Sequence, residues 1–139
     1  MTGDDGAAAM SDVPTPDWVA AEMWVWLSRF GVSDYRMRVH MEPLTDTDEV
    51  RTRGMATVQA RYLSACLTFC TSLQQDAEGR HVIAHECGHV LLGEVAAIVQ
   101  HLIDQLPARA RPLAYEMWDD ASDRTIERLT RALEGELHP

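Results

Sequence analysis

The chain has 139 residues, of which 46% are hydrophobic, and this length suits one domain with a single core. Its formal net charge is −10, from 12 lysines and arginines against 22 aspartates and glutamates. This excess of negative charge argues against a surface that binds the phosphates of a nucleic acid. No apolar run approaches the ~20 residues that a membrane-spanning helix needs. We therefore expect neither a nucleic-acid partner nor a membrane partner.

Residues 1–14 are acidic and rich in small side chains, so they resemble neither a signal sequence nor an anchor. They offer little surface to bury, which predicts a disordered leader. Residues 15–139 are expected to form one domain. Its first helix is predicted to start at Pro16 and to end before Gly31. Four large apolar residues on one face of this helix should pack in the core: Val19, Met23, Trp26 and Phe30.

Three short segments then alternate as half-buried strands do. In the first, Tyr35 to Leu44, apolar side chains face one way while arginine and histidine face the other. A polar loop, Thr45 to Gly54, separates it from the segments ATVQARY and LSACLTFC. The alternation changes phase between Tyr62 and Leu63, which predicts a turn or a bulge there. We expect a small three-stranded, mostly antiparallel sheet.

Two helices are predicted after the sheet. The first runs from about Arg80 to Leu106 and the second from about Leu113 to Glu134, with prolines in the turn between them. The order helix, sheet, helix, helix is typical of an α+β domain. The three cysteines form no CxxC pair, and their odd number without a signal peptide is typical of a reducing compartment. A cytoplasmic protein with free thiols is therefore expected.

The first of these two helices contains the sequence His85-Glu86-Cys87-Gly88-His89, an HExxH motif. Histidines four residues apart lie on one helix face about one turn apart, so both imidazoles can bind one Zn²⁺. Glu86 is rotated ~100° round the helix, which suits a general base acting on a water at the ion. The flanking residues are apolar, and burying these ionisable groups is costly unless a metal satisfies them. His81, one turn earlier, is expected at the surface rather than at the ion.

The motif and its flanks, Val82 to Leu92, resemble those of the zincin metallopeptidases. Within that group they resemble the small gluzincin-like forms of phages and mobile elements, which are distantly similar to ImmA/IrrE-type and SprT-like peptidases. The resemblance implies a minimal zincin-like α+β domain. Leu92 and Val95 stand where the metzincins have a glycine and a third histidine, so that extension is absent. The resemblance therefore implies a third protein ligand from the last helix.

Two acidic residues of the last helix compete to be this ligand. If the helix that carries the motif continues unbroken to Leu106, the length of the return helix favours Asp123. If it breaks near Gly93, Glu116 becomes reachable. Glu116 with Asp120 then resembles the ExxxD arrangement of thermolysin-type enzymes, in which the aspartate orients the first histidine. We favour Asp123 as the ligand.

These residues together predict a zinc-dependent metallopeptidase that acts on a protein or peptide. His85, His89 and the acid would hold Zn²⁺, and Glu86 would move a proton from a water to the leaving amine. The segment LSACLTFC is the candidate edge strand for aligning an extended substrate. Two alternatives stay open. One is a catalytically degenerate zincin that serves as a phage or prophage regulatory or binding module, and the other is a zinc amidohydrolase that is not a peptidase.

Overall fold

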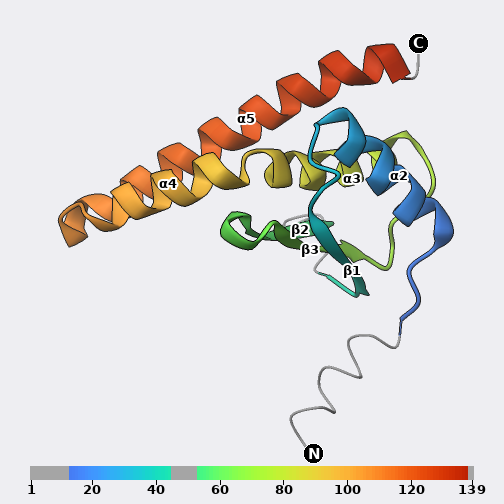
Figure 1. Ribbon diagram of the computed structural model, residues 1–139, viewed down its shortest axis with the longest axis horizontal. Coiled ribbons are helices and arrows are strands. Elements are labelled where there is room, and N and C mark those ends of the chain that lie inside the picture. The colour runs from blue at the N-terminus through green and yellow to red at the C-terminus, as the bar shows by residue number, and fades with distance from the viewer. Residues whose placement is uncertain (1–12, 45–52, 138–139) are drawn as a thin grey trace, which may run out of the picture.

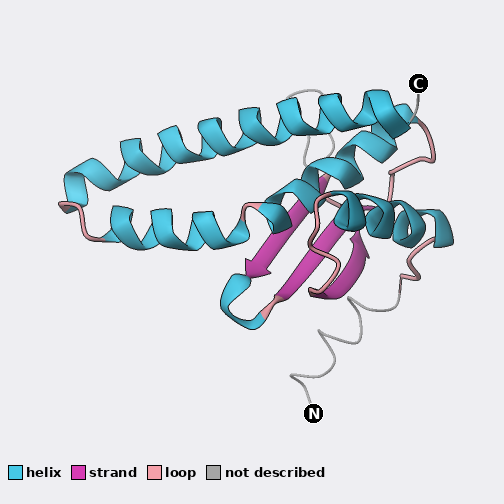
Figure 2. Cartoon of the chain, turned by 45° about the horizontal axis from the view of Figure 1, so that its top comes forward, coloured by secondary structure: helices cyan, strands magenta, loops and turns pink. Residues whose placement is uncertain are grey.

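The computed structural model describes residues 13–44 and 53–137 of the chain. Residues 1–12 of the predicted leader and 45–52 of the predicted polar loop lie outside these ranges. Figures 1 and 2 show a body of helices and sheet from which two antiparallel helices project. The predicted α+β class is confirmed. The elements are α2 (Asp17–Arg29), β1 (Arg36–Glu42), β2 (Gly54–Gln59), η1 (Ala60–Tyr62), β3 (Ser64–Cys70), α3 (Ala77–Leu91), α4 (Gly93–Asp104), η2 (Ala108–Ala110) and α5 (Arg111–Leu137).

The three predicted strands form one mixed sheet with the order β1-β3-β2. β2 pairs with β3 in antiparallel fashion, but β1 pairs with β3 in parallel, so only one of the two pairings has the predicted direction. β3 is central and its last four residues are buried. Its predicted role as an edge strand is therefore wrong, and β2 is an edge instead. Alternation shows which side of a strand is buried, but it does not show which strands become its neighbours.

The phase change predicted between the second and third strands is a short 3-10 turn, Ala60–Tyr62, followed by Leu63. Leu63 has φ 48° and ψ 48°, the left-handed conformation that reverses the chain direction. The two strands on either side then pair with Gln59 opposite Ser64. Both the turn and its position agree with the sequence.

The core lies between the sheet and the helices α2 and α3. α3 packs against β2 and β3, and α2 packs against α3 (Figure 2). The face of α2 predicted to be buried is indeed buried, because Val19, Met23, Trp26 and Phe30 are each at most 9% exposed. From the sheet, Leu67 and Phe69 of β3 are completely buried in the same core. α3 is thus held from two sides, which fixes the helix that carries the HExxH motif.

The helix predicted from Arg80 to Leu106 is in fact two helices, so this prediction is wrong. α3 begins earlier, after Asp76, whose carboxylate accepts a hydrogen bond from the Gly79 amide at 2.8 Å. It ends before Leu92, where ψ is 2°, and α4 continues at an angle of 62°. The apolar residues continue across the break, which is why periodicity alone did not reveal it.

α4 leaves the body and packs along the first half of α5 (Figure 1). Only Gly93 and Ile103 of α4 are buried. Among the described residues, no single helix has the length and apolar character needed to cross a membrane. α3 and α4 reach that threshold only when they are counted together across their bend.

Candidate metal centre

The structure brings together His85 and His89 of α3 and Asp123 of α5. The two imidazole rings lie on consecutive turns, with centroids 5.1 Å apart and planes at 77°. Asp123 Oδ1 lies 3.4 Å from His85 Nε2 and 3.5 Å from His89 Nε2. One nitrogen of each histidine and one oxygen of the aspartate all lie within 4.8 Å of one another. Three donor atoms therefore converge on one point between the two helices.

The spacing of these donors suits a small tetrahedral ion. Two ligands bound at 2.0–2.1 Å with a tetrahedral angle between them are about 3.4 Å apart. The two distances from Asp123 to the histidines, 3.4 and 3.5 Å, match that value. Burial, and then the charge of His85, lowers the pKa of His89, which favours the neutral imidazole that binds metals. The donor set and its geometry therefore fit Zn²⁺.

A close approach between α3 and α5 sets the position of Asp123. Gly88 of α3 and Ile126 of α5 are both buried. A Cβ atom on Gly88 would lie 2.5 Å from Ile126 Cγ2, so no larger residue fits without displacing the Ile126 side chain or α5. Ile126 stands between Asp123 and Glu127 in sequence. The contact at Gly88 therefore holds both of these acids at the level of the histidines.

Glu127 is a site residue that the sequence reasoning missed. Its Oε1 atom lies 3.0 Å from His85 Nδ1. His85 can donate its Nδ1 proton to this carboxylate, which leaves the Nε2 lone pair directed at Asp123 and His89. Asp123 and Glu127 are four residues apart and so share one face of α5. The sequence did contain a signal for Glu127. The ExxxD resemblance had paired Glu116 with an acid four residues later, and Glu127 follows Asp123 at the same spacing.

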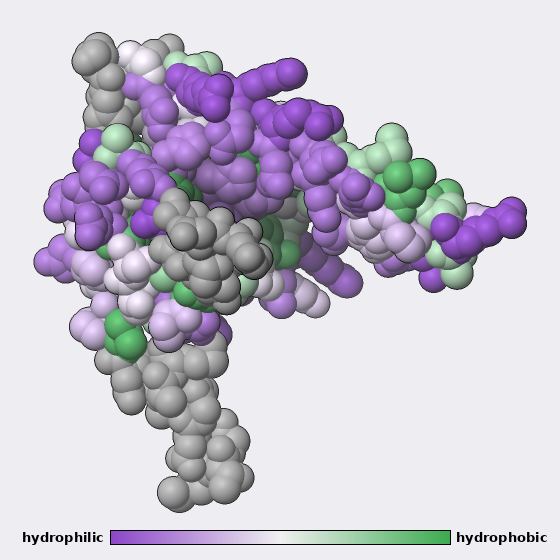
Figure 3. Space-filling view, turned by 180° about the vertical axis from the view of Figure 1, so that it is seen from behind, coloured by the Kyte–Doolittle hydropathy of each residue, from purple (hydrophilic) through white to green (hydrophobic). Residues whose placement is uncertain are grey.

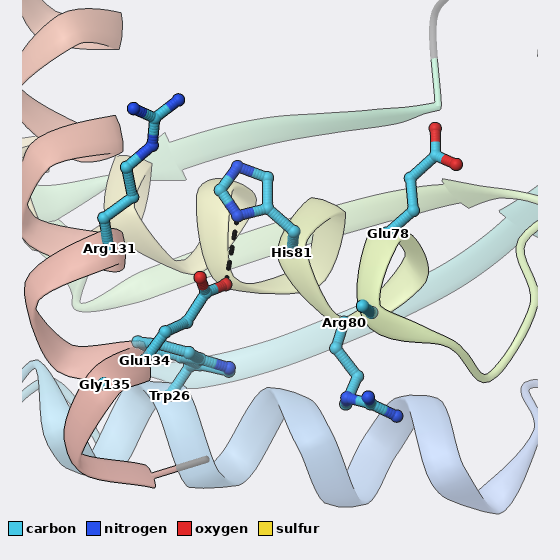
Figure 4. Close-up of a pocket in the computed structure, with 8 residues that line it drawn as sticks. Trp26, Glu78, Arg80, His81, Arg131, Glu134 and Gly135 are labelled. Carbon is cyan, nitrogen blue, oxygen red and sulfur yellow. Dashed lines mark hydrogen bonds and ion pairs between the residues drawn. The ribbon is translucent and has the colours of Figure 1, made fainter. Parts of the chain in front are cut away.

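His81 extends this network by one more turn of α3. Its Nε2 atom lies 2.9 Å from Glu127 Oε2, and its Nδ1 atom lies 3.0 Å from Glu134 Oε1 (Figure 4). Partial burial lowers the pKa of His81, but the hydrogen bonds with Glu134 and Glu127 outweigh it and raise the pKa overall. His81 is not among the converging donors, as expected. It is half-buried and links two acids of α5 rather than standing free at the surface.

Glu86 lies beside the cluster but is not part of it. Its side chain is buried, and burial raises its pKa to about 7, while His85 lowers the pKa and Asp123 raises it further. β2 passes directly over it, since a Cβ atom on Gly54 would lie 2.9 Å from Glu86 Cγ. A carboxyl group that titrates near neutral pH can both accept and release a proton there.

Glu116, the alternative third ligand, does not reach the cluster. It is exposed and lies seven residues before Asp123, which is about 10 Å along the helix axis. The helix does break after α3, the condition that had favoured Glu116, and yet Asp123 faces the histidines. Asp123 lies about as many residues after Pro107 as His89 lies before it. The two arms of the α4–α5 hairpin therefore bring these residues level despite the bend.

Two hollows adjoin the converging donors. The first, of about 170 Å³, lies beside His89 between β2, α4 and α5, and Val58 and Trp118 are among the residues that line it. The second, of about 380 Å³, lies beside Glu86 on the other side of the cluster. Glu78 and His81 are shared between this second hollow and a larger cleft nearby. The site thus adjoins one hollow at His89 and another at Glu86.

No protein-family model, no curated protein and no solved structure matches this chain.

Proposed function

We propose that this protein is a zinc-dependent metallopeptidase. The observation that carries the proposal is the convergence of His85, His89 and Asp123 beside the buried carboxyl group of Glu86. Two imidazoles and one carboxylate form the ligand set of many catalytic zinc sites, which keep a further position open for water or substrate. Zn²⁺ held by these residues would polarise a peptide carbonyl and make a water more acidic.

Glu86 has the properties of the general base in this reaction. It is rotated away from the converging donors, so it is free to take a proton from the attacking water. A pKa of about 7 lets the carboxylate accept that proton and then give it to the leaving amine. Glu127 holds His85 through Nδ1, and this fixes the ring orientation that the site needs.

β2 is the edge strand that supports binding of an extended peptide. Its pairing with β3 uses one edge, and the other edge has no strand partner in the described parts of the chain. A substrate strand added there would run past Glu86 at the Gly54 end and past His89 at the Val58 end. The hollow of about 170 Å³ beside His89 has the volume of about six water molecules, which suits one medium-sized side chain.

The proposal is tested by comparing the wild-type protein with Glu86→Gln on a peptide library, with zinc content measured in both. The wild type is expected to cleave, and removal of a positioned acid–base group should slow cleavage about 10²–10⁴-fold. Glu86→Gln should keep one Zn²⁺ per chain, because Glu86 is not a ligand. Glu116→Gln, an exposed acid outside the cluster, serves as the control. Cleavage by Glu86→Gln at the wild-type rate, or no cleavage by the zinc-loaded wild type, would overturn the proposal.

A further inference from the structure

A row of arginines runs along α5 beside the metal centre. Arg124, Arg128 and Arg131 follow the spacing i, i+4, i+7, which places them on one face of the helix. All three side chains are exposed. Together with Asp123 and Glu127 they line a hollow of about 350 Å³. The arginines therefore lie next to two residues of the candidate metal centre. In Figure 3 hydrophilic side chains cover much of the body of the molecule, whereas hydrophobic side chains gather on part of the projecting hairpin.

Arg131 also lines a cleft of about 680 Å³ between α2, α3 and the end of α5 (Figure 4). Arg80 and Trp26 line the same cleft. Because this cleft shares His81 and Glu78 with the hollow beside Glu86, the two form one depression that runs along α3 from the metal centre.

Three acidic residues at this depression, Glu78, Glu127 and Glu134, already have partners within the protein. Glu78 is paired with Arg53 at 2.5 Å. Glu134 is paired with His81 at 3.0 Å, and Glu127 contacts both His81 and His85. Each of these three carboxylates therefore already has an ion-pair or hydrogen-bond partner within the protein.

Four arginines around these hollows, in contrast to the three carboxylates, lack partners in the described parts of the chain. None of Arg80, Arg124, Arg128 and Arg131 has an ion-pair or hydrogen-bond partner within residues 13–44 and 53–137. In Figure 4, Arg131 and Arg80 lie on opposite sides of the His81–Glu134 pair, and neither guanidinium points at it. Arg80 and Arg131 line the depression that leads to Glu86, and Arg124 and Arg128 line the adjoining hollow at Asp123. These positive charges stand on a chain whose net charge is −10.

We propose that these four residues, the arginine cluster, bind an acidic segment of the peptide substrate. Guanidinium groups form paired hydrogen bonds with carboxylates, and these bonds supply both attraction and orientation. The row from Arg124 to Arg131 covers about 10 Å along the helix, which an extended peptide spans with about three residues. The preferred substrate therefore carries two or more acidic residues within a short stretch, a few residues away from the bond that is cleaved.

An acidic peptide fits this surface better than a nucleic acid does. A polynucleotide extends far beyond the arginine cluster, and the remaining surface of a chain with net charge −10 repels it. A short acidic segment can contact the four arginines without extending over the rest of that surface. The inference rests on the proposed peptidase function for the identity of the ligand, but binding can be measured without cleavage.

The test uses the Glu86→Gln protein and a fluorescent peptide with three consecutive glutamates, compared with the same peptide carrying glutamines. Fluorescence anisotropy at low salt should give a Kd at least tenfold lower for the acidic peptide, and added salt should reduce this preference. Arg128→Glu with Arg131→Glu should abolish the preference. Arg109→Glu, at the tip of the hairpin, is the charge-matched control and should change the Kd less than twofold.

Equal affinity for the two peptides would overturn the inference, as would an equal loss in the Arg109→Glu control. Tighter binding of a single-stranded DNA oligomer than of the acidic peptide would overturn the choice of ligand. Arg128→Gln with Arg131→Gln repeats the test without introducing new negative charge, and it too should lose the preference. Since none of these measurements involves hydrolysis, their failure is distinct from failure of the proposed peptidase activity.

Discussion

α3 and α4 follow each other directly in the chain, but they have very different surroundings. α3 is enclosed by α2, β2, β3 and α5, and seven of its residues are buried. α4 packs mainly on α5, and Val95, Ile98 and Leu102 are 51%, 62% and 60% exposed. Figure 3 shows hydrophobic surface on part of the projecting hairpin. The comparison teaches that packing on several sides of α3, rather than its apolar sequence, fixes the positions of the histidines in the proposed metal centre.

The largest expected difference in stability comes from replacing one isoleucine by alanine in each of the two helices. Ile83 of α3 is completely buried, whereas Ile98 of α4 is 62% exposed. Ile83→Ala should lower the free energy of unfolding by about 2–5 kcal/mol, because it leaves a cavity in the core. Ile98→Ala should change it by less than about 0.5 kcal/mol. Urea denaturation of both variants checks the comparison, which fails if the two costs are equal.

The burial of Glu86 should make the stability of the zinc-free protein depend on pH. The folded state raises the pKa of this group from 4.5 to about 7, so it binds the proton more tightly than the unfolded chain does. The resulting stabilisation is complete below about pH 4.5 and is lost as the pH rises through about 7. Its size is on the order of 3 kcal/mol.

Glu86→Gln removes this dependence and keeps the size of the side chain. The stability of the wild type minus that of the variant, measured with a chelator present, should therefore fall between pH 4 and pH 8. Titration of His89, whose pKa burial lowers, is common to both proteins and cancels in the difference. A difference that stays constant or rises with pH would contradict the assigned burial of Glu86.

A smaller effect on the free energy of unfolding is expected from a substitution at the contact between α3 and α5. Alanine is intrinsically better than glycine in a helix by about 1 kcal/mol. At Gly135, where a Cβ atom meets nothing within 4 Å, alanine should be neutral or slightly stabilising. At Gly88 the new methyl group collides with Ile126, and the cost should be about 1–3 kcal/mol. Thermal unfolding of the two alanine variants should therefore shift in opposite directions, or shift downward for Gly88→Ala alone.

Removal of the carboxylate that contacts His85 should weaken zinc binding. Glu127→Ala removes the carboxylate that accepts the Nδ1 proton of His85, and such losses weaken metal affinity about 10–100-fold. Asp120→Ala is the matched control, because the sequence had offered Asp120 for the same role. Asp120 is exposed, and its removal should leave the affinity nearly unchanged. Competition with a zinc-binding dye distinguishes the two, and an effect of Asp120→Ala as large as that of Glu127→Ala would refute the assignment.

The sequence predicted the parts of the site that depend on local geometry. His85, Glu86 and His89 lie within one and a half turns of helix, so their relative positions follow from the helix itself. Asp123 was favoured on the assumption of an unbroken helix, and it faces the histidines although the helix is broken. Asp123 lies level with the histidines because the two arms of the α4–α5 hairpin are of nearly equal length, and not because the helix is straight.

The missed features all depend on contacts between distant segments. Glu127 became a site residue only because Gly88 lets α5 approach α3. The contacts of His81 with Glu127 and Glu134 were missed because these partners lie about 50 residues further along the chain. The position of β2 at the edge of the sheet was missed for the same reason, since strand order is set by packing and not by alternation.

The most direct test of the metal centre is a zinc titration of the wild type, Asp123→Ala and Glu116→Ala under identical conditions. The wild type should bind one Zn²⁺ per chain. Asp123→Ala should weaken binding by more than the 10–100-fold expected for a supporting residue such as Glu127, and Glu116→Ala should bind as the wild type does. Normal binding by Asp123→Ala, or a loss in Glu116→Ala that equals or exceeds it, would contradict a centre built from His85, His89 and Asp123.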